Sequence, residues 1–153
     1  MDFEIFRKVA ARAYEDIPDK KKVFTLEQNL SIFEYFFKAY AERLGMEHIP
    51  IGRDNVRRLM EKLPYIDEKD AELGYFDIDP ETYPYLVDQY FSTKFFPGCN
   101  YRINHFMSAN IRELRLYEVQ AGWELAEACA DSMNRIKRTK EEKENEAKHK
   151  GGV

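Results

Sequence analysis

The chain of 153 residues has no window of about 18 apolar residues, the length that a membrane-spanning helix requires. Its two cysteines, Cys99 and Cys129, are too few for a disulfide framework and too far apart to pair as zinc ligands. The first residues begin with an amphipathic pattern and lack the apolar core of a signal peptide. We therefore expect no membrane contact and a reducing, cytoplasmic location.

Motifs that carry chemistry are also missing. The sequence contains no glycine-rich phosphate loop, no GxSxG elbow and no HExxH, and its histidines and cysteines form no pairs at metal-ligand spacing. Cys99 and His105 could act as a thiol and its base, but that chemistry also needs an orienting group and an oxyanion site. We expect no metal, no cofactor and no enzymatic activity, although catalytic groups that converge from distant positions stay an alternative.

Positive charge is scarce outside the C-terminus. Residues 135–153 carry seven Lys or Arg against four Glu, a local charge of +3, whereas residues 1–134 carry 17 basic and 24 acidic residues, a charge of −7. An acidic body disfavours general attraction to nucleic acid, which depends on neutralising phosphates. The tail could supply at most a weak attraction that salt removes.

Helical periodicity dominates the rest of the sequence. Apolar residues recur at steps of three and four in the segment 2–17, and Thr25 with Gln28 predicts a capping box at the start of a helix that ends at Gly45. A shorter helix is expected to begin with Asp54 as its cap and to stop at Pro64. Asp79 and Pro80 suggest the start of a fourth helix, which could begin in earnest only at Pro84 and run to about Thr93.

No proline follows Pro97, so the final helix is expected to begin near Asn104 or Ser108 and to be long. A helix from 108 to 148 would measure about 60 Å at 1.5 Å per residue, more than a compact domain of this size can enclose. The sequence predicts an all-α protein, a single bundle of about five helices with a long C-terminal helix. We place the helical domain at 1–136 and a charged, frayed or disordered tail at 137–153.

Two apolar stripes follow the last helix. One stripe runs through Ile111, Leu114, Gly122, Leu125, Cys129 and Ile136, and the other through Leu116, Val119, Trp123, Ala126, Ala130 and Met133. One stripe can face the domain core, and the second then needs another surface to cover it, unless one bundle buries both. We predict that Leu116, Val119, Trp123, Ala126, Ala130 and Met133 bind a protein partner or a second copy of the chain.

Three arginines offer an alternative site. Arg102, Arg112 and Arg115, with tyrosines nearby, could contact phosphates and stack on bases. In an acidic body, arginines more often pair with neighbouring acids such as Glu113 or Glu118. Direct nucleic-acid binding is therefore the alternative hypothesis, and we expect such binding to be weak.

The stretch YFSTKFFPGCNYRINHFMSANIR, residues 90–112, is the densest in aromatic residues, and we interpret it first as a corner that plugs into the core. It resembles a segment of small uncharacterised proteins of phages and integrative elements of Gram-positive bacteria, over residues 80–118. The resemblance implies a mobile-element setting and no activity. Small acidic helical proteins in that setting often load or inhibit nucleic-acid machinery, so we expect a non-enzymatic interaction protein.

Overall fold

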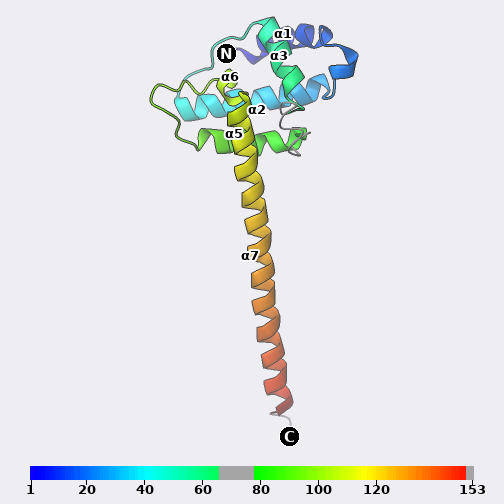
Figure 1. The fold of residues 1–153 in the computed structure, drawn as a ribbon, viewed down its shortest axis with the longest axis vertical. Helices are drawn as coiled ribbons and strands as arrows, with labels where there is room; N and C mark the ends of the chain where they lie inside the picture. Colours follow the sequence, from blue (N-terminus) through cyan, green and yellow to red (C-terminus); the bar gives the residue numbers. More distant parts are fainter. Residues whose placement is uncertain (66–77, 151–153) are drawn as a thin grey trace. The chain divides into compact units, whose positions relative to one another are not determined.

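The computed structural model describes residues 1–65 and 78–150, without the side chains of Ala109 and residues 144–150. The described part is all-α, with a long C-terminal helix and no β-strand, as predicted. Its helices are α1 (Phe3–Glu15), α2 (Leu26–Leu44), α3 (Arg53–Lys62), α5 (Tyr83–Phe91), α6 (Ile103–Phe106) and α7 (Ala109–Lys150), with 3₁₀ turns at Asp19–Lys21 and Pro80–Thr82 (Figure 1). None of these helices is both long and apolar enough to cross a membrane.

The chain divides into two compact units, Met1–Tyr117 and Glu118–Val153. The boundary that the sequence predicted at 136 lies inside the second unit. The first unit therefore ends about twenty residues before the charged tail begins, and the apolar residues between 118 and 136 belong with the tail.

The ends of α2 form as the sequence predicts. The Thr25 hydroxyl accepts a hydrogen bond from the Gln28 amide at 3.1 Å, and the Gln28 side chain accepts one from the Thr25 amide at 2.9 Å. Gly45 closes the helix at a φ of 67°, a left-handed conformation that glycine adopts without steric cost. These local signals set the first and last residues of α2.

The prediction that Asp54 caps α3 is wrong. The cap is Gly52, whose carbonyl accepts from the Val56 amide at 3.0 Å, so the helix begins at Arg53 and Asp54 lies in its first turn. An acid in the first turn still compensates the helix dipole, which explains why Asp54 looked like a cap. The α5 helix begins at Tyr83 with Pro84 in its first turn, close to the later of the two starts that the sequence allowed.

The core of the first unit is built from aromatic rings. Helix α1 packs on α2 and α3, and α2 packs along α5 (Figure 1). The Phe36 ring, at the centre of α2, is fully buried and lies 5.2 Å from the Phe91 ring and 5.3 Å from the Phe106 ring. Tyr90 lies 5.2 Å from the Phe106 ring. Much of the dense aromatic stretch is therefore core, as we interpreted it.

Candidate functional site

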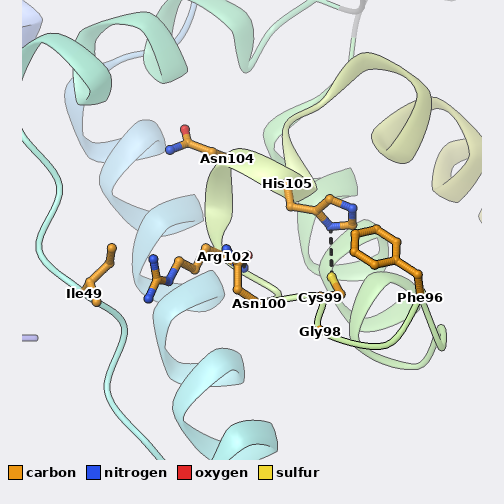
Figure 2. A pocket seen from close by; sticks show the side chains of 8 residues that line it. All are labelled: Ile49, Phe96, Gly98, Cys99, Asn100, Arg102, Asn104 and His105. Atoms are coloured by element: carbon orange, nitrogen blue, oxygen red, sulfur yellow. Dashed lines mark hydrogen bonds between the residues drawn. The ribbon is translucent and has the colours of Figure 1, made fainter.

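The turn between α5 and α6 encloses the first candidate site, a cavity of roughly 430 Å³ (Figure 2). Both residues of the hypothetical thiol and base pair line it. Figure 2 shows Cys99 and His105 facing each other, with Phe96 beside the imidazole. The complete lining is Ile49, Phe96, Gly98, Cys99, Asn100, Arg102, Asn104 and His105.

Two side chains contact the same nitrogen of the His105 imidazole. Its Nδ1 lies 2.8 Å from the Tyr90 hydroxyl and 3.6 Å from the Cys99 sulfur. Partial burial, and secondarily the charge of Arg115, lowers the pKa of His105 and favours the neutral ring. Burial also raises the pKa of Tyr90, so its hydroxyl stays protonated. Tyr90 and Cys99 therefore compete for the same nitrogen of His105, and the Tyr90 hydroxyl is the closer of the two.

Tyr101 fixes the shape of this turn. Its φ of 54° is a left-handed conformation that costs a bulky residue about 1–3 kcal/mol. The Tyr101 hydroxyl donates to the Thr93 carbonyl at 3.0 Å and accepts from the Phe95 amide at 3.2 Å. These two bonds hold the ring beside α5 and stabilise the strained backbone. The walls of the cavity are therefore pre-formed.

His48 joins the loop after α2 to the start of α6. Its Nδ1 donates to the Ile49 carbonyl at 2.7 Å, and its Nε2 accepts from the Ile103 amide at 3.1 Å. The two bonds require the neutral imidazole, because a protonated Nε2 could not accept. Burial lowers the pKa of His48 and favours that form. This role could not be predicted from the sequence, since a lone histidine in a loop forms no pattern with its neighbours.

Arg112 lies in the core, 2% exposed. Its guanidinium donates to the Lys62 carbonyl at 2.7 Å, to the Tyr83 hydroxyl at 3.0 Å and to the Tyr65 carbonyl. Tyr83 in turn donates to the Leu63 carbonyl. The last carbonyls of a helix carry partial negative charge, so a cation at this point satisfies them. Arg112 thus closes the C-terminal end of α3.

The three arginines of the nucleic-acid hypothesis do not form one exposed surface. Arg115 is 5% exposed, and its guanidinium lies 5.3 Å from the centre of the Phe95 ring. Arg102 is partly exposed and lines the cavity beside His105. With Arg112 in the core, a phosphate could reach only Arg102 without a rearrangement of the fold.

Exposed basic residues instead line a second hollow, of roughly 560 Å³, between α3 and the end of α6. Arg58 and Lys62 reach it from consecutive turns of α3, and Asn55 and Asn104 add polar groups. Neither basic residue forms an ion pair with any residue that the structure describes, unlike Arg57, which pairs with Glu61 at 3.2 Å. This hollow could accept an anionic group.

The predicted partner-binding stripe divides into a buried and an exposed part. Leu116 and Val119 are buried, whereas Trp123, Ala126, Ala130 and Met133 are exposed. Every residue from 120 to 143 is exposed, including Leu125 and Ile136 of the other stripe. The two stripes therefore form one broad surface along the second unit.

This surface, which we call the apolar face, covers about 220° of the helix circumference at 100° per residue. Polar residues occupy the remaining arc, which we call the polar face. The polar face consists of Gln120, Glu124, Glu127, Asp131, Asn134, Arg135 and Arg138. The apolar face consists of Val119, Gly122, Trp123, Leu125, Ala126, Cys129, Ala130, Met133 and Ile136, with Ala121, Ala128 and Ser132 at its edge.

Comparison of the chain with protein-family models, with curated proteins and with solved structures finds no match. Within the described residues, no three His, Cys, Asp or Glu side chains gather closely enough to hold a metal ion. The sites above therefore have to be judged on their geometry alone.

Replacement of Arg112 by lysine tests the closure of α3. The shorter ammonium cannot reach the carbonyls of Lys62 and Tyr65 together, so buried acceptors lose their donors although the charge is kept. We expect Arg112→Lys to lower the free energy of unfolding by about 2–4 kcal/mol in chemical denaturation. The matched control Arg58→Lys, on the exposed side of α3, should change it by less than about 0.5 kcal/mol. Equal effects of the two variants would contradict the role of Arg112.

The neutral imidazole of His48 predicts a pH dependence. The pKa of His48 is lowered from its unfolded value near 6.5, so its stabilisation is complete above that pH and is lost as pH falls through 6 and 5. His105 shifts in the same direction. We expect the free energy of unfolding to fall between pH 7 and 5, by at most about 1.4 kcal/mol per pH unit for each histidine. His48→Ala should be less stable at pH 7 and should show a shallower dependence; an unchanged slope would count against His48.

Proposed function

We propose that the protein is a non-enzymatic interaction protein that binds another protein surface through the apolar face of α7. One observation carries the proposal: from 120 to 143 the helix buries no side chain, although its apolar face includes Trp123, Leu125, Met133 and Ile136. Large apolar surface that a chain leaves exposed marks an interface. An amphipathic helix is also a common recognition element, because it lies into an apolar groove through residues at steps of three and four.

The energetics of the helix support this proposal. Isolated helices gain little stability from propensity alone, and most of their stability in proteins comes from burying one face. Burial of an apolar side chain contributes about 1.5–3 kcal/mol. A partner that covers Leu125, Met133 and Ile136 would therefore stabilise the helix and hold itself in place by the same contacts.

The cavity beside His105 supports an enzymatic function less well. Its imidazole acceptor is engaged by Tyr90, and the turn around it is held by bonds that also shape the core. In the mobile-element setting that the resemblance of residues 80–118 implies, an interaction protein of this kind would load or inhibit a component of nucleic-acid machinery. The first unit would then act as the scaffold that carries α7.

A charge on the apolar face tests the proposal. Met133→Glu should abolish binding of the natural partner, because a carboxylate in an apolar interface loses its hydration without compensation. The matched control is Asn134→Glu, which adds the same charge one residue further on the polar face and should bind as the wild type does. Affinity purification of the tagged full-length chain from its host, with quantification of what co-purifies, measures the difference. Thermal unfolding of both variants verifies that the first unit stays folded, and equal recovery with both would contradict the proposal.

Direct nucleic-acid binding is the second candidate function, supported by the hollow that contains Arg58 and Lys62. The body charge of −7 opposes it, so we expect binding of generic DNA or RNA to be weak and to vanish at moderate salt. Fluorescence anisotropy of a labelled oligonucleotide at 50 and 200 mM salt measures this. Tight binding at the higher salt that is lost in Arg58→Ala with Lys62→Ala would reverse the ranking of the two functions.

A further inference from the structure

We propose that the apolar face of α7 is covered by the same face of a second copy of this chain, with the two helices antiparallel. This inference rests on the proposed function and deepens it, because it names the occupant of the surface. The distribution of side-chain size along residues 119–136 is self-complementary when one helix is reversed and is not when the two run in the same direction. Reversal also keeps the two basic segments apart.

A heptad seam runs along the centre of the apolar face. Its positions are Val119, Gly122, Ala126, Cys129, Met133 and Ile136, at alternating steps of three and four. In an antiparallel pair centred between Ala126 and Cys129, Gly122 faces Met133 of the other copy and Ala126 faces Cys129. Each layer then combines a smaller with a larger side chain, as close packing requires. Val119, which would come opposite Ile136, is already buried in the monomer, so the layers of Gly122 and Met133 form the two ends of the interface.

On one flank of the seam, Leu125 comes opposite Ser132 of the other copy, again a large side chain opposite a small one. The small residues at the centre, Ala126, Cys129 and Ala130, allow the two backbones to approach closely.

A parallel pair lacks this complementarity. It would place Gly122 against Gly122 and Met133 against Met133, so one layer would hold a void and another would be overfilled. Voids and overpacking each cost free energy in an interface as they do in a core. The order of sizes therefore favours the antiparallel arrangement over the parallel one.

The positions of the basic residues also favour the antiparallel pair. Residues 118–131 contain four acidic residues and no basic one, and residues 135–140 contain four basic residues and no acidic one. A parallel pair would gather all eight basic residues at one end. The antiparallel pair separates the two basic segments by about 20 residues, or roughly 30 Å, which exceeds the Debye length of about 10 Å at 0.1 M salt.

The size of the interface predicts its strength. The exposed part of the seam, from Gly122 to Met133, spans about 17 Å of helix, so the area that two such helices bury is at the low end for specific protein interfaces. We expect a dimer that dissociates on dilution. Concentration-dependent sedimentation of the full-length chain measures its dissociation constant.

Exchange of side-chain size between two seam positions tests the pairing. Gly122→Met places methionine against Met133 and should raise the dissociation constant at least about tenfold, because overpacking costs about 1–3 kcal/mol. The same substitution improves helix propensity, so an effect on helix formation alone would strengthen the dimer. The double variant Gly122→Met with Met133→Ala restores one large and one small residue per layer and should return the constant to within about threefold of the wild type. Failure of the second substitution to restore the dimer would overturn the register.

Spin labels test the direction of the two helices. Arg138→Cys, labelled in a chain that carries Cys99→Ser and Cys129→Ala and is first verified to dimerise, should give a distance between labels of about 30 Å or more. A parallel pair would bring the same labels within about 20 Å, and that result would overturn the proposal. Glu127→Cys, near the centre, is the control and should give a short distance in either arrangement.

A wild-type chain that remains monomeric at all accessible concentrations would exclude the second copy as the occupant. The proposed function would survive that result if Met133→Glu still lost a partner that Asn134→Glu retained, because the apolar face would then bind a different protein. Loss of both the dimer and the partner difference would end both proposals. The experiments therefore distinguish loss of the proposed dimer from loss of the proposed partner binding.

Discussion

The fold of the first unit depends on one buried cation. The Arg112 guanidinium satisfies carbonyls at the end of α3 and the hydroxyl of Tyr83 at the start of α5. These groups come from segments 29 and 50 residues earlier in the chain. A buried charge is costly unless its hydrogen bonds are met, so the ends of α3, α5 and α7 must meet at this point for the core to close. The first turns of α7 therefore bury one face in the core, whereas no side chain from 120 to 143 is buried.

The burial of side chains therefore changes along α7. Arg112, Arg115, Leu116 and Val119 are buried, and from 120 onward the same helical periodicity continues without burial. Apolar residues at steps of three and four predict that one face of a helix is buried. They do not indicate whether the protein's own core or a partner protein buries it. For this reason the sequence could predict two apolar stripes and could not decide between a core and an interface. The structure separates them by position along the helix.

The starts and ends of helices could be predicted from the sequence where they depend only on neighbouring residues. The capping box of Thr25 and Gln28, the left-handed Gly45 and the late start of α5 at Pro84 each depend on residues within one turn. The cap of α3 was mispredicted because Asp54 suits both the cap and the first turn. Arg112 and His48 could not be found from the sequence at all. Their partners, the carbonyls of Lys62 and Ile49 and the amide of Ile103, are backbone groups that leave no trace in residue type.

Cys99 and His105 lie close together in the cavity, but proximity alone does not make them a reactive pair. Sequence spacing raised the possibility of a Cys99 and His105 pair, and the fold brings the two within 3.6 Å. The Tyr90 hydroxyl is closer to the same nitrogen, at 2.8 Å, and competes with Cys99 for it. This contact joins α5 to α6. Large apolar side chains that the fold does not bury lie instead along α7, at Leu125, Met133 and Ile136.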